Sequence, residues 1–337
     1  MKICCIALSV FFLSMISCNQ NEQKTDDFPE LSGPYLGQSL PGSGPEVFAP
    51  GIIGTGMFTR DIAISPDGKE LFYSVAIGNY TYSTILYTKQ INGKWSTPEV
   101  APFAASAKTM DLEPAFNPAG NRLYFISSRP VDGNETGGQD IWYVERIADG
   151  WSDPVHPGTP LNTDAGEFFP SFTNDGYLYF TREAAGDPLN GIYRSKITDN
   201  TFTEPERLPE QVNCGSTRFN AFVSRDHSYI IVPAADMKDA YDQVDYYIVF
   251  RDKNDQWSQP LNMSEQINKD NSRGWSPFVS PDGNYFFFMS NKSEDIPVSD
   301  FSYKKLVELY NDPMNGNATM YWMKADFIEE LREKAVF

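Results

Sequence analysis

Charged and polar side chains recur shortly before an apolar run at five places in this sequence. They are Arg60, Asp61, Asp111, Glu113, Glu167, Arg218, Asn220, Arg273 and Trp275. Carboxylates, guanidinium groups and an indole could together bind a polar ligand, such as a sugar or a peptide terminus, through charge-assisted hydrogen bonds and stacking. We therefore take these residues as a candidate ligand-binding site, which exists only if the fold brings the five places together.

Two other interpretations of the same residues stay open. Charged residues at the starts of strands commonly pair with neighbouring sheets, and Glu113 could simply accept backbone N–H groups. Alternatively, one of Asp111, Glu113 and Glu167 could act as the acid and another as the base of a carbohydrate-active hydrolase or lyase. That mechanism depends on the separation of the carboxylates, so the sequence assigns no catalytic residue.

The sequence offers few residues for a metal site or for nucleophilic catalysis. The two histidines, His156 and His227, lie in a loop and at a turn, and they are too few for a His-rich metal centre or a Ser–His pair. Residues 132–140 carry oxygen ligands, but Tyr143 stands where a calcium loop needs a glutamate, so a polar hairpin loop is the preferred interpretation. We predict no metal site and no cofactor.

Five copies of one motif must position the candidate residues. Each copy is a strand, a tight turn and a second strand, in residues 64–74, 116–127, 172–181, 223–232 and 279–290. Intervals of 52, 56, 51 and 56 residues separate the turn residues Pro66, Pro118, Asn174, Arg225 and Pro281. Asp-Gly supplies the hairpin turn, and the flanking runs are β-branched and aromatic. This period predicts one four-stranded sheet per repeat.

The outer strand of the last sheet is missing from the fifth repeat. In the other repeats an outer element begins at Trp95, Trp151, Phe202 and Trp257, and we assign the three tryptophans to packing between blades. Residues 43–47 match residues 96–100 of the first outer element. The amino-terminal segment is therefore predicted to supply the missing strand and to close a ring without a free sheet edge.

The predicted fold class is all-β, a β-propeller of four-stranded blades. The motif Ser-Pro-Asp-Gly-x-x-Leu-Tyr-Phe-x-Ser, with Glu113-Pro114 before it and Asp140-Ile141-Trp142 after it, resembles the WD-repeat-like propeller repeat of TolB-like bacterial exported proteins. The resemblance covers the chain from Pro45 to about Phe327. Five blades can be counted, and a degenerate sixth stays possible because such rings usually have six. The resemblance implies the fold and little of the function, since propellers host enzymes, lectins and scaffolds alike.

The amino terminus is predicted to be an export signal. Residues 3–16 form an apolar run that is too short to cross a hydrocarbon core of roughly 30 Å. The sequence Leu-Ser-Met-Ile-Ser-Cys, which ends at Cys18, resembles the lipobox of bacterial lipoproteins. The resemblance implies a signal peptide over 1–17, a lipidated Cys18, a flexible tether over 18–42 and a propeller domain over 43–337 that ends in a short helix. An ordinary secretory signal with an incidental cysteine is the alternative.

Net charge argues against nucleic acid as a partner, and the cysteine content argues against an internal disulfide. The formal net charge is −18 and no cluster of Lys or Arg occurs, so nucleic acid is not expected. After export and lipidation only Cys214 would remain, so no internal disulfide is expected. We interpret the chain as a monomeric, lipid-anchored propeller of the bacterial outer membrane, on its periplasmic or surface face. It would bind an envelope protein or a glycan, or act as a scaffold, without catalysis; the alternative is the carbohydrate-active enzyme described above.

Overall fold

The structure, a computed structural model, describes residues 28–337 except 132–137, 184–189, 199–200, 270–273 and 294. The predicted signal peptide, Cys18 and Arg273 lie outside the described residues. The chain divides into two units, and the propeller lies in the second, which runs from Leu31 to Phe337. No helix among the described residues is long and apolar enough to span a membrane.

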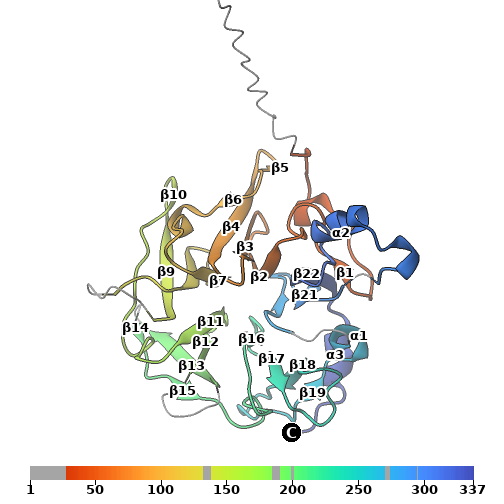
Figure 1. The fold of residues 1–337 in the computed structure, drawn as a ribbon. Coiled ribbons are helices and arrows are strands. Elements are labelled where there is room, and N and C mark those ends of the chain that lie inside the picture. The colour runs from red at the N-terminus through yellow and green to blue at the C-terminus, as the bar shows by residue number, and fades with distance from the viewer. Residues whose placement is uncertain (1–27, 132–137, 184–189, 199–200, 270–273, 294) are drawn as a thin grey trace, which may run out of the picture. The chain divides into compact units, whose positions relative to one another are not determined.

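Five antiparallel sheets surround a common axis in this unit, as Figure 1 shows. Blade 1 contains β2 (Phe58–Ile64), β3 (Glu70–Ile77), β4 (Tyr82–Ile91), β5 (Lys94–Trp95) and β6 (Glu99–Val100). Blade 2 contains β7 (Asp111–Phe116), β8 (Arg122–Ser127), β9 (Asp140–Ile147) and β10 (Gly150–Trp151). Blade 3 contains β11 (Glu167–Phe172), β12 (Tyr177–Arg182), β13 (Gly191–Thr198), β14 (Thr201–Phe202) and β15 (Glu206–Arg207).

The last two blades and the helices complete the unit. Blade 4 contains β16 (Phe222–Val223), β17 (Tyr229–Ala235), β18 (Val244–Phe250) and β19 (Leu261–Asn262). Blade 5 contains β20 (Phe278–Val279), β21 (Tyr285–Ser290), β22 (Thr319–Lys324) and β1 (Glu46–Val47). The helices are η1 (Tyr35–Gly37), η2 (Pro102–Ala104), α1 (Glu265–Asn268), η3 (Val298–Asp300), α2 (Tyr303–Tyr310) and α3 (Phe327–Arg332). The outermost strand is split into two short pieces in blades 1 and 3, so each blade has four strand positions, and the predicted five-bladed propeller is confirmed.

The hairpin turns form for the reason that the repeat motif suggests. In blade 1 the hydroxyl of Ser65 accepts a hydrogen bond from the backbone N–H of Glu70 at 2.9 Å, and Gly68 adopts a φ of 71°. In blade 5 Ser280 accepts from the N–H of Tyr285 at 3.0 Å. A serine hydroxyl that satisfies a backbone donor and a residue that tolerates positive φ together stabilise the tight turn. In blade 4 His227 takes the glycine position with a φ of 65°.

The amino-terminal strand closes the ring as predicted. β1 pairs with β22 in antiparallel register, with Glu46 opposite Trp322 and Val47 opposite Tyr321. Directly after β1, the backbone N–H of Phe48 donates to the carbonyl of Met320 at 2.8 Å. The ring of Phe48 is fully buried, and its centroid lies 5.0 Å from that of Trp322. The last blade therefore presents a paired strand where its edge would otherwise be open.

The chain reaches the ring before β1. Leu36 is buried, and the indole Nε1 of Trp95 donates to the carbonyl of Gly33 at 2.8 Å. The backbone N–H of Lys324 donates to the carbonyl of Gly42 at 3.0 Å. The carboxyl-terminal part of the segment that we predicted as a tether thus packs on blades 1 and 5.

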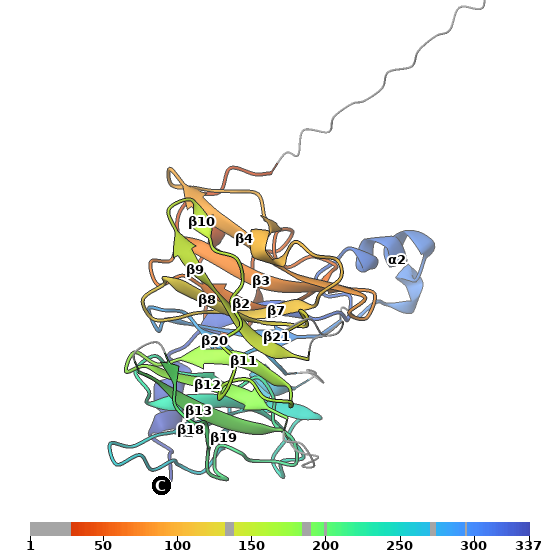
Figure 2. The same cartoon turned by 90° about the vertical axis from the view of Figure 1, so that its left-hand side faces the viewer.

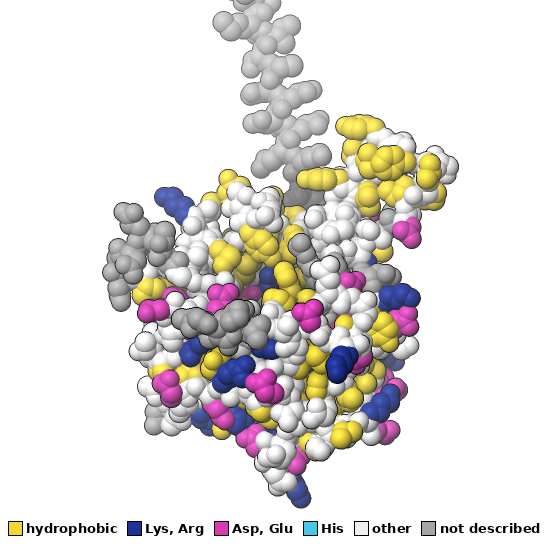
Figure 3. Space-filling view, turned by 60° about the horizontal axis from the view of Figure 1, so that its bottom comes forward, with side chains coloured by type: hydrophobic (Ala, Val, Ile, Leu, Met, Phe, Trp, Pro, Cys, Tyr) yellow, Lys and Arg dark blue, Asp and Glu magenta, His cyan; other side chains and the backbone are white. Residues whose placement is uncertain are grey.

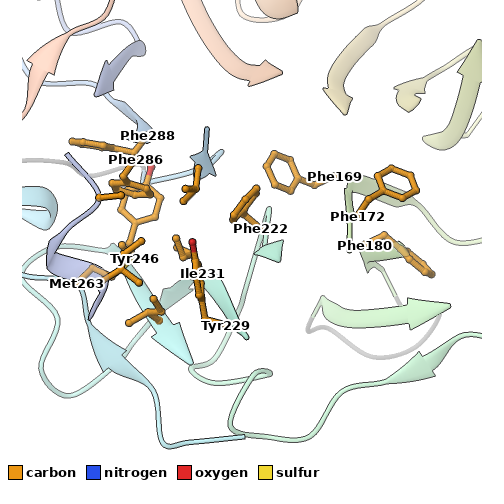
Figure 4. Packing of buried hydrophobic residues seen from close by; sticks show 14 of the residues in the cluster. Phe169, Phe172, Phe180, Phe222, Tyr229, Ile231, Tyr246, Met263, Phe286 and Phe288 are labelled. Atoms are coloured by element: carbon orange, nitrogen blue, oxygen red, sulfur yellow. The ribbon is translucent and has the colours of Figure 1, made fainter. Parts of the chain in front are cut away.

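The core lies between blades, because the middle strands are covered on both faces. Every residue of β18 and β21 is buried, which explains why these runs are apolar at successive positions instead of alternating. Figure 4 shows Phe286 and Phe288 of blade 5 next to Tyr246 of blade 4. Toward the axis, Figure 4 shows Phe222 and Phe169 from neighbouring inner strands.

An asparagine ties the third strand of three blades to the segment that follows its outer strand. In each case the side-chain amide accepts from the backbone N–H of one strand residue and donates to the carbonyl of that same residue. The pairs are Asn162 with Ile141, Asn213 with Ile192 and Asn268 with Tyr246. The accepting distances are 3.0, 2.7 and 2.8 Å. Each asparagine follows a fully buried aliphatic residue, in the pairs Leu161-Asn162, Val212-Asn213 and Ile267-Asn268. This recurring pair is a sequence signal that the repeat analysis did not use.

Candidate functional site

Equivalent residues, in or just before the five inner strands, meet at the axis of the ring. Counted back five residues from each turn residue, they are Asp61, Glu113, Phe169, Asn220 and Ser276. Four of them have a positive φ between 54° and 59°, namely Asp61, Glu113, Phe169 and Ser276. In blades 1, 2 and 3 the pairing of the first two strands shifts register at this place, which marks a β-bulge. A bulge redirects side chains at such a position, here toward the other blades.

Glu113 is the centre of the hydrogen bonds that cross the axis. Its Oε1 accepts from Nη2 of Arg60 at 2.5 Å and from Nδ2 of Asn220 at 2.6 Å. Its Oε2 accepts from the backbone N–H of Phe169 at 2.7 Å. The N–H of Glu113 itself donates to the hydroxyl of Ser74 at 2.9 Å. One carboxylate thus connects blades 1, 2, 3 and 4.

Asp61 and Arg60 extend these bonds to the fifth blade. Asp61 accepts from Nε of Arg60 at 2.7 Å and from the hydroxyl of Ser276. Nη1 of Arg60 donates to the hydroxyl of Tyr80 at 3.1 Å, and the guanidinium carbon lies 5.5 Å from the ring centroid of Trp275. We call Arg60, Asp61, Glu113, Asn220 and Ser276 the axial network. Arg60 is only 6 % exposed and Glu113 only 3 %, so the axial network is buried at the centre of the ring.

The structure brings together five of the nine candidate residues: Arg60, Asp61, Glu113, Asn220 and Trp275. Sequence reasoning missed Phe169 and Ser276. Both occupy the same position of the repeat as Asp61, and alignment by the turn would have found them if uncharged residues had been included. A ligand that bound the axial network would have to replace bonds that already connect all five blades, so its binding there stays a prediction.

Asp111 and Glu167 lie at the starts of their inner strands and make separate contacts. Asp111 accepts from Nη2 of Arg129 at 3.1 Å. Glu167 accepts from Nε of Arg182 at 2.8 Å and from the hydroxyl of Thr163 at 2.6 Å. Burial raises the pKa of both carboxyl groups, and in each case the neighbouring arginine opposes the rise. Each carboxylate is therefore paired with an arginine of its own blade.

Arg218 binds the backbone of its surroundings. It is almost fully buried and donates to the carbonyls of Cys214, Gly215 and Asn190 at 3.1, 2.6 and 3.0 Å. Arginine is well suited to this arrangement because its guanidinium group carries five donors in a fixed plane. The geometry shows Arg218 fastening the start of blade 4 to blade 3.

The described residues offer few metal ligands. No group of three or more His, Cys, Asp or Glu side chains among them is close enough to hold a metal ion. His156 contacts Asp140 at 3.2 Å, and its ring lies tilted against that of Trp142 with the centroids 4.8 Å apart. Nδ1 of His227 contacts Asp175 at 3.1 Å. Most of the polar loop over 132–140 lies outside the described residues.

The axis is also narrow on the side of the hairpin turns. A cavity of about 40 Å³ remains there, lined by Phe116, Phe172, Phe222 and Phe278 among others. A space of this size admits about one water molecule and no sugar ring. Aromatic packing on this side and the axial network together fill the centre of the ring.

Glu113 has a perturbed acidity that results from its position. Burial raises the pKa of Glu113 to about 7, and the negative charge of Asp61 adds to the rise, while Arg60 opposes it. One guanidinium group thus faces two carboxylates, so adding the second negative charge is unfavourable in a buried site.

We expect Glu113 to make stability depend on pH. The folded protein holds the proton of Glu113 more tightly than the unfolded chain, whose glutamate has its ordinary pKa of 4.5. The stabilisation linked to this proton is complete below pH 4.5 and disappears as the pH rises through about 7. We therefore compare the melting temperatures of the wild type and of Glu113→Gln by circular dichroism. The advantage of the wild type over the variant should decrease as the pH is raised from 5 to 8. A difference that stays constant over this range would contradict the protonation of Glu113.

Comparison with known proteins gives distant structural similarity only. No family model and no curated protein matches the sequence. Among solved structures the chain is similar to TolB from Acinetobacter baumannii, at 15 % identity and a TM-score of 0.46. The match covers 79 % of this chain, which spans only 57 % of that TolB chain. It is also similar to an α-L-arabinofuranosidase from Podospora anserina solved with cellotriose, at 12 % identity and a TM-score of 0.46 over 84 % of this chain and 93 % of that one. An oligogalacturonate lyase in complex with manganese gives 12 % identity and a TM-score of 0.42 over 77 % of this chain and 63 % of that one. Similarities at this level carry no conclusion about function.

Proposed function

We propose that this protein is a lipid-anchored, exported β-propeller of the bacterial outer membrane that binds an envelope protein or a glycan, or serves as a scaffold, and catalyses no reaction of its own. The lipobox-like sequence before Cys18 and the polar segment after it support anchoring. The net charge of −18 and the absence of basic clusters disfavour nucleic acid as the partner. We expect the protein to be a monomer.

The observation that carries the proposal is that each of the three candidate carboxyl groups forms an ion pair with an arginine. The ion pairs are Asp111 with Arg129 at 3.1 Å, Glu113 with Arg60 at 2.5 Å and Glu167 with Arg182 at 2.8 Å. A pair of hydrolytic carboxyl groups must instead face a common substrate, with one protonated and the other ionised. The side chains of all three carboxylates are almost completely buried, which favours a structural role for them.

One observation favours the alternative, an exported carbohydrate-active hydrolase or lyase. A carboxyl group whose pKa lies near neutral, as burial makes that of Glu113, is typical of a general acid. In this second candidate function Glu113 would donate a proton to the leaving group of a glycan. Substrate could reach it only if the axial network opened.

A single experiment separates the two functions and tests the anchor. The full chain should fractionate with the outer membrane, whereas the Cys18→Ser variant should not, because it lacks the sulfur that takes the lipid. The Cys18→Ser variant, which is not expected to carry the lipid, is then incubated with envelope polysaccharides. Mass spectrometry is used to analyse the recovered glycans. Our proposal predicts intact glycans. Shorter products that disappear with Glu113→Gln or Glu167→Gln would establish the enzyme instead, and a membrane-bound Cys18→Ser variant would overturn the anchor.

A further inference from the structure

We propose that a cavity between blade 1 and blade 5 binds a neutral oligosaccharide, an inference that rests on the proposed binding function and gives it a site. The cavity has a volume of about 670 Å³, and no residue of the axial network lines it. Three segments form it: residues 55–58 before and at the start of β2, residues 76–80 at the end of β3 and in the following turn, and part of the long connection between β21 and β22 that contains α2. Its size is in the range that holds a small ligand of several rings.

The described lining of the cavity is uncharged. No described residue that lines it is Asp, Glu, Lys, Arg or His, although the chain as a whole carries a net charge of −18. Its polar groups are mainly side-chain amides, and it also contains aromatic residues. The six residues of most interest for binding are Asn79, Asn311, Asn317, Phe58, Tyr80 and Tyr310.

Uncharged amides next to aromatic residues match the chemistry of a neutral sugar. Each amide can both donate to and accept from hydroxyl groups. An aromatic ring offers a flat apolar surface against which the C–H face of a pyranose can pack. Uronic acids, phosphorylated sugars and peptide termini would bring charges that none of the described lining residues can neutralise. The chemistry therefore favours a neutral oligosaccharide over an acidic glycan or a peptide.

The wall on the side of blade 5 is held in place by close contacts with Gly56. The carbonyl of Gly56 accepts hydrogen bonds from Nδ2 of Asn315 and of Asn317, both at 3.0 Å. A Cβ atom at Gly56 would lie 2.4 Å from the carbonyl oxygen of Tyr310, which ends α2. Only glycine allows the two segments to approach so closely. The cavity is thus built before a ligand arrives, which lowers the entropic cost of binding.

The wall on the side of blade 1 is fixed by the axial network. Tyr80 lines the cavity and accepts from Arg60 through its hydroxyl at 3.1 Å, and its ring lies edge-on against Phe58 at 5.5 Å. The guanidinium group of Arg60 itself is not part of the lining. The charged centre of the ring therefore supports the cavity without entering it.

The connection that carries α2 projects from the ring beside this cavity. Figure 2 shows α2 standing clear of the blades, and Figure 3 shows hydrophobic side chains gathered on the projecting part. Tyr303 and Tyr310 of α2 are 84 % and 74 % exposed. Tyr310 lines the cavity and Tyr303 does not. This difference provides a matched control within one helix.

Isothermal titration with neutral oligosaccharides tests the inference. The probes are cellohexaose, xylohexaose and mannohexaose, with trigalacturonic acid as the charged counterpart. We expect at least one neutral probe to bind and the charged probe not to bind. The cavity variant Asn79→Ala/Tyr310→Ala should weaken the bound probe by about tenfold or more, because it removes one amide and one ring from opposite walls.

The control variant is Asn92→Ala/Tyr303→Ala. Asn79 and Asn92 both lie in exposed turns of blade 1 with a φ of 53°, and only Asn79 lines the cavity. The control should bind within twofold of the wild type, and both variants should keep the wild-type melting temperature. Equal weakening by the two variants, preference for trigalacturonic acid, or binding of no neutral probe would overturn the inference.

The outcomes also separate this inference from the proposed function. Capture of an envelope protein with no affinity for any neutral probe would leave the binding function standing and remove the glycan site. Cleavage of a neutral probe that still depends on Tyr310 would keep the cavity and overturn the absence of catalysis.

Discussion

Replacing Arg60 with methionine should lower the free energy of unfolding by about 3–5 kcal/mol, because it removes the cation and hydrogen-bond donor that two buried acidic side chains share. Arg60 donates to Asp61 at 2.7 Å and to Glu113 at 2.5 Å, and all three side chains are buried. Methionine keeps much of the apolar contact of the arginine stem, so the loss reports mainly on the charge. Urea unfolding followed by tryptophan fluorescence measures it.

Arg122→Met is the control for this substitution. Arg122 donates to Glu145 at 2.6 Å, but that carboxylate is about half exposed. Water and salt screen an ion pair at the surface, so its loss should cost at most about 1 kcal/mol. An Arg60→Met variant that lost no more stability than Arg122→Met would show that the axial network does not hold the ring together.

Replacing Phe48 with alanine should cost about 3–5 kcal/mol, the usual range for removing a fully buried aromatic ring. Phe48 follows β1 directly and packs between Phe287 and Trp322 of blade 5, with ring centroids 5.1 and 5.0 Å away. Its loss would also loosen β1 from β22 and expose a strand edge. We therefore expect aggregation on heating in addition to the lower free energy of unfolding.

Leu40→Ala provides the comparison in the same segment. Leu40 precedes β1 and is exposed, so its truncation should change stability by no more than about 0.5 kcal/mol. Light scattering during thermal unfolding should start at a lower temperature for Phe48→Ala than for Leu40→Ala. Equal behaviour of the two variants would mean that the amino-terminal strand does not close the ring.

The architecture was predictable because each blade repeats the same local physics. A tight turn with a residue of positive φ, an apolar second strand and a regular period determine a stacked sheet, and five copies determine a ring. Even the closing strand left a trace, since residues 43–47 match an outer element of another blade. The predicted pairing of this segment with blade 5 is confirmed by the register of β1 with β22.

The site was only partly predictable because the inner strands do not keep a regular alternation. In an ideal strand Asp111 and Glu113 would share one face, since side chains two apart point the same way. The register shift between Leu112 and Ala115 breaks that relation, so Glu113 joins the axial network and Asp111 pairs with Arg129 instead. Alignment of the repeats alone assigns both carboxylates to one candidate ligand-binding site.

A signal for these bulges is present in the sequence. A proline directly follows the residue of positive φ in three blades, as Pro114, Pro170 and Pro277. Proline inside a strand is confined to edges and bulges, because it cannot donate to the sheet. The arginine partners of Asp111 and Glu167 have no such signal. Arg129 follows the second strand of blade 2 and Arg182 ends that of blade 3, and only the folded structure shows which carboxylates they contact.

A double-mutant cycle of Arg60→Met and Glu113→Gln, with the free energy of unfolding measured at pH 7, decides whether the buried charges hold the ring together. If they stabilise the ring through each other, the double variant should be more stable than Arg60→Met alone, because it removes one of the two buried acidic groups that lose their shared cation. Costs of the two substitutions that simply add would contradict this, and would show that Arg60 and Glu113 do not stabilise the ring through each other.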